Sequence, residues 1–460
     1  MRKRWFIPVI LLLVLAGVFA WQLPALLRAL PSRYVARLPE PVQALGVREH
    51  VDRLPTAAAP MKDEDVDRLL APAVAAASDE TPAATRVATD SPPTPSPPPT
   101  TGPVSEPDST ATASPTSAAT PTSPPPPTPT PVPIAPSARL EGVQHRFQDW
   151  NNCGPATLSM LLTYFQIYRS QTQTAAVLKP DPEDRNVSPH EMAAYVNDET
   201  EVAALDRANG DLATLRRLVS NGFPVIVEVG IDPPGEFAWM EWYGHYLLVV
   251  AYDDPSETFW VYDSWFGTSN VPQENADDEG REISYAELER YWSHFNWNYI
   301  VAYQPEDAGT VADIIGEEMD DAVMWQNALE RVQSKLSDDS DNAFLWFNLG
   351  TVFNAMGDYE RAAAAFDRAR SIGLPWRMLW YQFGPYEAYY ETGRYEDVIV
   401  LTDVTLQDRP YFEEAFYYKG LAQLALGEVD AARKNLEKAV DFNPNFEPAA
   451  EALQAMASSN

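Results

Sequence analysis

The chain has one cysteine, Cys153, in the segment QDWNNCGPATLSMLLTYF that begins at Gln148. The residues after it predict a helix whose N-cap would be Asn152 and whose first turn would hold Pro155. Unpaired backbone N–H groups and the helix dipole at that end stabilise a thiolate and lower the pKa of the thiol. A lone cysteine is more often an inert buried side chain, but this position favours a nucleophile.

A thiolate nucleophile needs an imidazole, and His245 is the best placed of the five histidines. It opens the most apolar predicted strand, HYLLVVAYDD, which would hold the ring rigidly. Asp263 ends the next predicted strand and could orient that imidazole, although either residue could simply mark a strand end. Gln148 could donate its side-chain amide, beside the Cys153 backbone N–H, to an oxyanion.

Gln, Cys, His and Asp in this order, with helices before strands, form a papain-type arrangement that predicts acyl transfer. Cys153 would attack an amide carbonyl, and His245 would protonate the leaving amine and activate water. The same residues could carry out transpeptidation or cleave cell-wall amides, and a non-catalytic protein-binding scaffold is the other alternative. No histidine pair has the spacing of metal ligands, so we expect neither a metal nor a cofactor.

The loop IDPPGEFAWMEWYG before His245 predicts a wall of the substrate-binding site. The aromatic residues that would form this wall are Trp239, Trp242 and Tyr243. The same residues could equally form a hydrophobic flap that packs on the domain.

Helices precede strands in the region around these residues. Apolar residues recur with helical spacing after Cys153: Leu158, Leu161, Leu162 and Phe165. SPHEMAAYVNDE predicts a second helix with Ser188 as N-cap and Glu191 closing a capping box, and DLATLRRLVSNG predicts a third. The runs PVIVEV, HYLLVVAYDD, TFWVYDSW and NYIVAY then predict strands, with a helix at SYAELERYW. This order predicts an α+β domain over residues 138–306.

Residues 144–304 resemble the bacteriocin-leader-processing, papain-like cysteine peptidases (cysteine peptidase family thirty-nine) and their stand-alone relatives. The matching elements are Q-x4-NCGPA, NGFPVIVEV, GHYLLVVAYDD and VYDSW. The resemblance implies a nucleophile, a base, an orienting carboxylate and an oxyanion-stabilising glutamine at these positions: Cys153, His245, Asp263 and Gln148. Two departures are that Ser264 follows Asp263 where the family often has proline, and that no transporter follows the domain, so leader peptides are not implied as substrates.

Residues 307–460 predict an all-α tetratricopeptide-repeat solenoid of three repeats with capping helices. The repeat glycines Gly357, Gly393 and Gly427 are spaced by 36 and 34 residues. In the middle repeat Tyr386 replaces the helix-contact glycine. Pro385 interrupts the first helix of that repeat and is expected to kink it.

The first helices of the repeats predict an aromatic, concave surface that would bind a protein partner or the substrate. Its residues would be Phe344, Phe347, Asn354, Trp380, Phe383, Glu387, Tyr390, Tyr417 and Leu421. The alternative is that this groove is filled by the protein's own capping helix or by the peptidase domain.

The N-terminal segment MRKRWFIPVILLLVLAGVFAW joins a cationic start to an apolar run. It predicts a signal anchor or transmembrane segment over residues 1–30, with the bulk of the chain extracytoplasmic. Cleavage after Ala20 and secretion is the alternative. Residues 31–137 predict a juxtamembrane and disordered Pro/Ser/Thr-rich linker, which would act as a stalk.

Composition excludes some functions. The net charge of −33 argues against nucleic-acid binding and against docking on anionic lipid beyond the N-terminal segment. A single thiol excludes an internal disulfide, so the domains must be stabilised by packing.

Overall fold

The structure is a computed structural model that describes residues 22–23, 53–57, 69–70, 134–232, 241–269 and 279–458. Almost all of the predicted membrane segment, and most of the predicted linker, lie outside these residues. Among the described residues no helix is both long enough and apolar enough to cross a membrane.

The first part of the fold is a seven-stranded antiparallel sheet with the order β2-β7-β3-β4-β5-β6, in which β1 pairs with β4. The strands are β1 (Ser137–Arg139), β2 (Ala203–Arg207), β3 (Val225–Ile231), β4 (Tyr243–Asp253), β5 (Thr258–Asp263), β6 (Arg281–Ser284) and β7 (Tyr299–Tyr303). Strand β3 is buried over its whole length, and β4 is buried at all but its two end residues. These central strands therefore carry continuous apolar runs rather than an alternating pattern.

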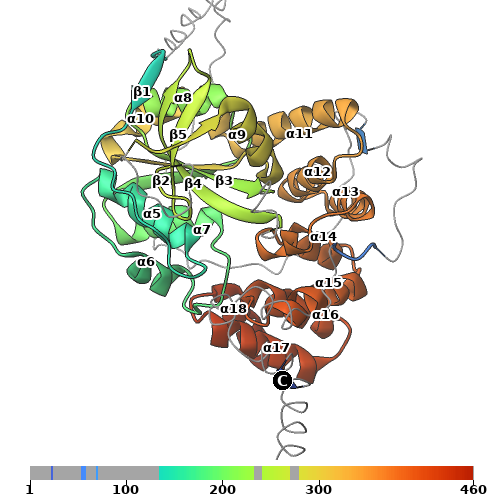
Figure 1. Ribbon diagram of the computed structural model, residues 1–460. Helices are drawn as coiled ribbons and strands as arrows, with labels where there is room; N and C mark the ends of the chain where they lie inside the picture. The colour runs from blue at the N-terminus through green and yellow to red at the C-terminus, as the bar shows by residue number, and fades with distance from the viewer. Residues whose placement is uncertain are drawn as a thin grey trace, which may run out of the picture. The chain divides into compact units, whose positions relative to one another are not determined.

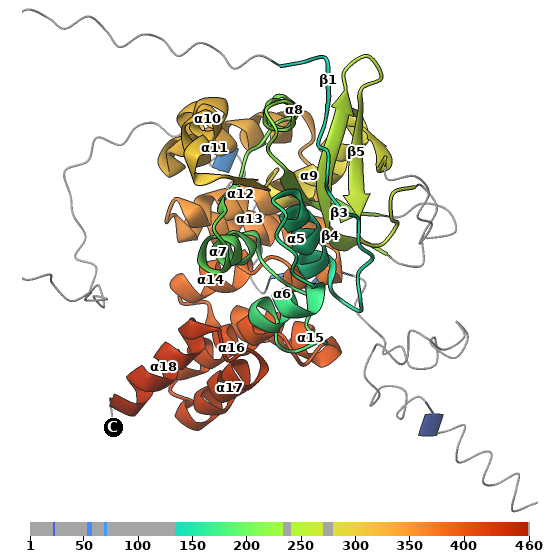
Figure 2. The same ribbon diagram turned by 90° about the vertical axis from the view of Figure 1, so that its left-hand side faces the viewer.

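Helices accompany this sheet and contact either its strands or one another. They are α5 (Cys153–Tyr164), α6 (Gln171–Leu178), α7 (Pro189–Glu199), α8 (Leu212–Ser220), α9 (Tyr285–Trp292) and α10 (Ala308–Ile315). Helix α5 contacts β3 and β4, whereas α7 contacts β2 and β7. Helices α5, α6 and α7 gather beside the strands in both ribbon views (Figures 1 and 2). The α+β architecture predicted for this region is confirmed.

Capping residues and apolar patterns in the sequence predicted most of these elements at the correct positions. Helix α7 begins after Ser188 with the predicted capping box to Glu191, and α8 begins after Asp211, whose carboxylate accepts from the Thr214 backbone N–H. Helix α6 and the short strands β1, β2 and β6 were not predicted. They are short, and their sequences carry no apolar periodicity long enough to mark an element.

The second part of the fold is a series of antiparallel helices, drawn in orange to red in Figure 1. They are α11 (Asp321–Asp338), α12 (Ala343–Ala355), α13 (Tyr359–Ile372), α14 (Gly384–Glu391), α15 (Tyr395–Asp408), α16 (Glu413–Ala425), α17 (Val429–Phe442) and α18 (Glu447–Ser458). A Cβ atom at Gly350 would lie 2.6 Å from the Phe366 ring, and one at Gly420 would lie 2.8 Å from Leu436. Glycine at these positions therefore allows the two helices of a repeat to approach closely.

The middle repeat differs from the prediction. Its first helix is not kinked at Pro385, because a 3-10 turn (Trp376–Trp380) replaces the first part and α14 begins only at Gly384. Proline lies in the first turn of α14, where its missing N–H removes no hydrogen bond. Tyr386, which replaces the contact glycine, is buried, and its hydroxyl lies 2.8 Å from that of Thr405.

The predicted concave surface is partly filled by the sheet domain. The Phe344 ring stacks on His294 with 3.7 Å between ring centroids, and it also stacks on Trp242. Phe347 and Trp380 are almost completely buried, so these two residues belong to the core rather than to an open groove. Asn354 is buried and donates to the Gly384 carbonyl oxygen. The other predicted residues of this surface are half-buried: Phe383, Glu387, Tyr390, Tyr417 and Leu421.

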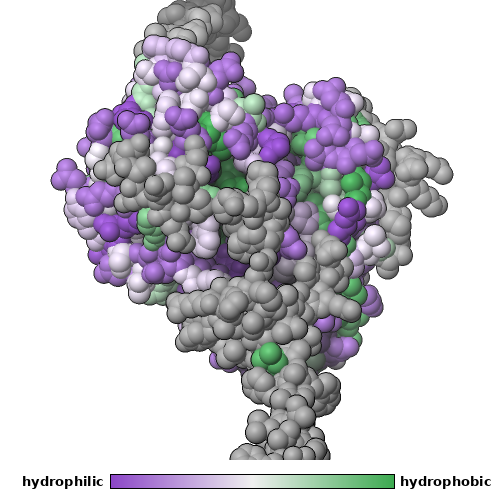
Figure 3. All heavy atoms as spheres, in the orientation of Figure 1, coloured by the Kyte–Doolittle hydropathy of each residue, from purple (hydrophilic) through white to green (hydrophobic). Residues whose placement is uncertain are grey.

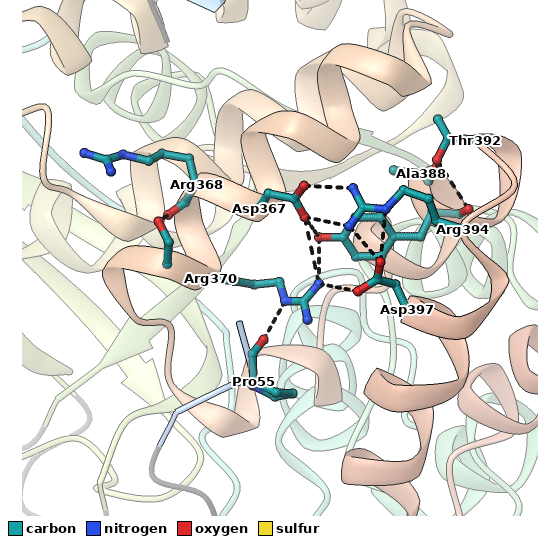
Figure 4. A network of polar contacts seen from close by, with 10 residues as sticks. Pro55, Asp367, Arg368, Arg370, Ala388, Thr392, Arg394 and Asp397 are labelled. Carbon is teal, nitrogen blue, oxygen red and sulfur yellow. Dashed lines mark hydrogen bonds and ion pairs between the residues drawn. The ribbon is translucent and has the colours of Figure 1, made fainter. Parts of the chain in front are cut away.

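A short piece of the predicted linker lies against the repeats. The Leu54 N–H donates to the Leu374 carbonyl oxygen, and Arg370 donates to the carbonyl oxygen of Pro55. Arg370 is buried and belongs to the polar network drawn in Figure 4, which also contains Asp367, Tyr389, Arg394 and Asp397. Residues 53–57 of the predicted linker therefore belong to the same folded unit as the repeats.

The surface is mainly polar. Hydrophilic residues cover most of the described part of the face shown in Figure 3. The exposed large hydrophobic side chains of the described residues are spread over several elements: Ile134, Tyr168, Val177, Met319, Met356, Val400, Leu426 and Val429.

Candidate active site

Cys153 is the first residue of α5, and its side chain is half-buried with a free thiol. Asn152 is the N-cap residue, as predicted, but its side chain makes no capping hydrogen bond and donates instead to Gln171 Oε1. The first-turn N–H groups of α5 therefore have no side-chain acceptor at the N-cap, which leaves their partial positive charge directed at the sulfur.

His245 lies near the beginning of β4 and connects Cys153 to Asp263. Its Nε2 lies 2.9 Å from Asp263 Oδ1, and the imidazole is near enough to the Cys153 thiol to lower the pKa of that thiol. Because Nε2 is used by the carboxylate, Nδ1 is the nitrogen that remains for the sulfur. Antiparallel pairing of β4 with β5 puts Leu247 opposite Asp263, which brings the end of β5 beside the imidazole. The structure thus brings these three predicted residues together.

Asp263 is completely buried and its carboxylate has several partners. Oδ1 also accepts from the backbone N–H groups of Trp265 and Phe266, and Oδ2 forms an ion pair with Arg281 at 2.9 Å. These donors fix the orientation of the carboxylate. Arg281 comes from β6, which was not predicted, so its role could not be predicted either.

The electrostatics of the site favour a thiolate–imidazolium pair. Burial raises the pKa of Cys153, but the hydrogen bond and the charge of His245 and the Gly154 N–H bring the pKa below its usual value. Burial lowers the pKa of His245, but the charge and hydrogen bond of Asp263, together with Cys153, raise it to about 10. Burial works against ionisation of Asp263, yet His245 and Arg281 hold the pKa of its carboxyl below the usual range. These opposite shifts of the thiol and the imidazole stabilise the ion pair.

Gln148 is held by Ser264, the residue that follows Asp263. The Ser264 hydroxyl donates to Gln148 Oε1 at 2.8 Å, and the Gln148 backbone N–H donates to the Ser264 carbonyl oxygen at 2.8 Å. Because Oε1 is occupied, the amide presents Nε2 as its free hydrogen-bond donor. Ser264 is the residue at which this sequence departs from the family pattern, and its hydroxyl forms a contact that proline could not form.

The predicted substrate wall is only partly supported. Trp239 lies outside the described residues. Trp242 is 4 % exposed, stacks on Phe295 and donates to His294, so it belongs to the core between the sheet and the repeats. Tyr243 does lie at the site, since its ring meets that of His245 edge-on at 5.9 Å. An aromatic pattern in a sequence does not distinguish a wall from a packed flap, and for Trp242 the packed arrangement is the one found.

Two buried ionisable residues near Cys153 were missed by the sequence analysis. The charge of Lys179, which is 2 % exposed and donates to the Asp184 carbonyl oxygen, helps to lower the pKa of the thiol. Glu228 on β3 is 3 % exposed, and burial raises its pKa to about 8 despite a hydrogen bond from Asn298. The described residues contain no group of three or more His, Cys, Asp or Glu side chains arranged to hold a metal ion.

Comparison with known proteins agrees with this geometry. Residues 140–294 match the model of the "Peptidase_C39 like family", and residues 345–372 and 414–445 match models described as "Tetratricopeptide repeat". A search of curated proteins found no significant match.

Three solved structures are similar to parts of the chain. A C39-like peptidase from Bacillus anthracis is 15 % identical, with 36 % of this chain and 96 % of that chain covered and a TM-score of 0.28. MamA from Desulfovibrio magneticus RS-1 is 18 % identical, with 30 % and 76 % covered and a TM-score of 0.27. The first tetratricopeptide domain of Spaghetti (RPAP3), bound to an HSP90 peptide, is 18 % identical, with 26 % and 94 % covered and a TM-score of 0.24. On the family matches, the chain contains a C39-like peptidase domain over residues 140–294, followed by tetratricopeptide repeats.

Proposed function

We propose that the C39-like domain is an active cysteine peptidase that hydrolyses an amide bond through a thioester. The observation that carries this proposal is the buried His245, whose imidazole is bonded to Asp263 and acts on the Cys153 thiol. A domain retained only for protein binding does not require a half-buried cysteine, a buried imidazole and an oriented carboxylate side by side. The oriented amide of Gln148 supports the same conclusion.

In the acylation step the Cys153 thiolate attacks the carbonyl carbon, and a C–S bond forms as the carbonyl π electrons move to oxygen. The Cys153 backbone N–H and Gln148 Nε2 stabilise this oxyanion. The oxyanion then collapses, the C–N bond breaks, and His245 Nδ1 gives its proton to the leaving amine. The product is a thioester and a neutral imidazole.

In the deacylation step His245 Nδ1 takes a proton from water, and the hydroxide attacks the thioester carbon. The second oxyanion uses the same two donors. Its collapse breaks the C–S bond and releases a carboxylic acid, and the Cys153 thiolate and the His245 imidazolium are restored. Asp263 stabilises the imidazolium in both steps and stays ionised throughout.

The place of action and the role of the repeats are part of the proposal. The cationic and apolar N-terminal segment supports a membrane-tethered protein whose peptidase domain is extracytoplasmic. Tetratricopeptide repeats support binding of a protein partner or substrate. The half-buried residues Phe383, Tyr390 and Tyr417 remain for this role, because the sheet domain covers the Phe344 region.

Alkylation of Cys153 by iodoacetamide, followed by intact mass, tests the activated thiol. We expect rapid alkylation at pH 6 to 7, where an ordinary thiol with a pKa of about 8.5 is mostly protonated. His245→Ala should slow the reaction at least about tenfold, because the ion pair is lost. The exposed His190, replaced by alanine, is the matched control.

Substrate turnover then decides between hydrolysis and the alternatives. Comparison of protein N-termini in cells carrying the wild type or Cys153→Ala should reveal new N-termini that depend on the thiol. If iodoacetamide reacts slowly and independently of His245, the domain is a scaffold rather than an enzyme. If the thiol is reactive but the acyl group is passed to an amine, the reaction is transpeptidation.

A further inference from the structure

Three arginine side chains surround one indole where the sheet domain meets the repeats. The guanidinium carbons of Arg185, Arg377 and Arg409 lie 5.0, 5.5 and 5.2 Å from the ring centroid of Trp380. Arg185 also lies over the ring of Trp150, at 5.3 Å. This arginine–tryptophan cluster joins the loop before α7, the segment before Cys153 and the middle repeat.

The positive charge of the cluster is not balanced. Arg377 pairs with Glu241 at 3.5 Å and Arg409 pairs with Asp408 at 3.0 Å, but no ion pair joins Arg185 to a carboxylate in the described part of the chain. The charges of the other two arginines and burial lower the pKa of Arg185. Such a concentration of positive charge is unexpected in a chain whose net charge is −33.

Several buried donors of this cluster also have no acceptor. Arg185 Nε, Arg409 Nε, and Nε1 of Trp150 and Trp380 are inaccessible to solvent and form no hydrogen bond within the described residues. An unsatisfied buried donor costs about 1–3 kcal/mol. Four such donors at one place carry a cost that an acceptor from outside the chain would remove.

The cluster is close to the nucleophile. Trp150 precedes Cys153 by three residues. Tyr381, which follows Trp380, interacts electrostatically with both Cys153 and Arg185, and its ring lies directly over Gly244 beside His245. Tyr381 therefore links the cluster to the strand that carries His245.

We propose that the arginine–tryptophan cluster is a subsite for a carboxylate of the peptide substrate. The inference rests on the proposed peptidase function and adds the substrate class. A guanidinium presents paired N–H donors that match the two oxygens of a carboxylate, and the indole N–H groups add further donors. The carboxylate can belong to an Asp or Glu side chain near the scissile bond or to the C-terminus of the peptide.

Calorimetric titration of the full-length chain tests the subsite without requiring a reactive thiol. The probes are three acetylated tripeptides: amidated Ala-Gln-Ala, amidated Ala-Glu-Ala, and Ala-Gln-Ala with a free C-terminal carboxylate. We expect one of the two carboxylate probes to bind about tenfold more tightly than the neutral probe, as one charge-assisted hydrogen bond provides. Which of the two binds more tightly identifies the source of the carboxylate.

Variants of the cluster show where the preference arises. Arg185→Gln should abolish the preference for a carboxylate probe over the neutral probe, and Arg185→Lys should retain part of it. The control is Lys434→Gln, which removes the same charge at an exposed position of α17 and should leave the preference intact. Arg409→Gln replaces Arg185→Gln if the latter does not fold. Equal affinities in the wild type, or a preference that survives in the folded cluster variant, would overturn the inference. Iodoacetamide reactivity, measured on the same samples, reports separately on the proposed peptidase function.

Discussion

Gln148 shows how a single neighbouring side chain can prepare an oxyanion donor. A glutamine amide can present either its oxygen or its nitrogen to a substrate, and only the nitrogen stabilises an oxyanion. The Ser264 hydroxyl donates to Oε1, so the amide is locked with Nε2 as the available group. The departure from the family pattern at this position thus has a structural role, since Ser264 acts as a positioning residue for Gln148.

Ser264→Ala should lower kcat while KM stays nearly unchanged, because the oxyanion forms only after the substrate binds. We expect a loss of about tenfold, compared with about 100-fold for Gln148→Ala, which removes the donor itself. Steady-state kinetics on a peptide substrate provides the measurement, and Ser337→Ala on the exposed side of α11 is the control. An equal loss in kcat for Ser264→Ala and Ser337→Ala would contradict a positioning role.

Glu228 makes the stability of the domain depend on pH. Its pKa is raised from 4.5 to about 8, so its carboxyl is neutral in the folded protein and ionised in the unfolded chain between these values. Its contribution is fully present below pH 4.5 and is lost as the pH rises through about 8. Since one pKa unit corresponds to about 1.4 kcal/mol, ionisation of this one buried group destabilises the fold appreciably.

Glu228→Gln should therefore be more stable than the wild type at pH 9 and nearly equal to it at pH 4. The amide oxygen can still accept from Asn298, so the folded geometry is preserved. Urea unfolding at several pH values gives the free energy of unfolding for both proteins, with the exposed Glu330→Gln as the control. A difference between Glu228→Gln and wild type that does not change with pH would be inconsistent with a raised pKa.

At the scale of helices and strands, two of the three repeats have a glycine where their paired helices touch, and the middle repeat does not. In the first and third repeats, Gly350 and Gly420 let the paired helices touch. In the second, the buried Tyr386 occupies the equivalent place and bonds to Thr405. The bulky side chain is accommodated because a 3-10 turn and a short helix replace the long first helix of an ordinary repeat.

Gly350→Val should destabilise the protein by about 1–3 kcal/mol, because its side chain would overlap the Phe366 ring. Ala355→Val, at an exposed position of the same helix, introduces the same β-branched side chain where no ring faces it, and its small loss of helix propensity sets an upper limit for a propensity effect. Thermal and urea unfolding measure both. Equal effects of the two substitutions would show that the close helix contact contributes nothing.

Elements marked by a cap and an apolar pattern within one short segment could be predicted from the sequence. Side-chain contacts between residues on different elements could not. Helix α7 was predicted because its cap and its periodicity lie within one short segment. Ser264 and Arg281 could not be assigned, since their contacts with Gln148 and Asp263 join residues on different elements. Trp242 was misassigned for a related reason, because the same aromatic side chain suits a pocket wall and a domain core.

At the scale of the whole folded unit, the sheet and the repeats share one hydrophobic core. Trp242 stacks between Phe295 of the sheet domain and Phe344 of α12, and Asn348 of α12 donates to the Ser293 carbonyl oxygen. Strand β4, which carries His245, is therefore preceded by a residue that packs on α12. The repeats support the site structurally in addition to any partner that they bind.

Phe344→Ala should weaken the sheet domain and the repeats together. Removal of a large aromatic side chain from a core typically costs about 3–5 kcal/mol, and less is expected here because Phe344 is half-buried. Amide hydrogen exchange on the full chain should show faster exchange in peptides from both β4 and α12, since opening of the shared contact exposes both. Val400→Ala, which shortens an exposed side chain on α15, should change neither. Faster exchange confined to α12 would mean that the two parts unfold independently and that the repeats do not stabilise the catalytic strand.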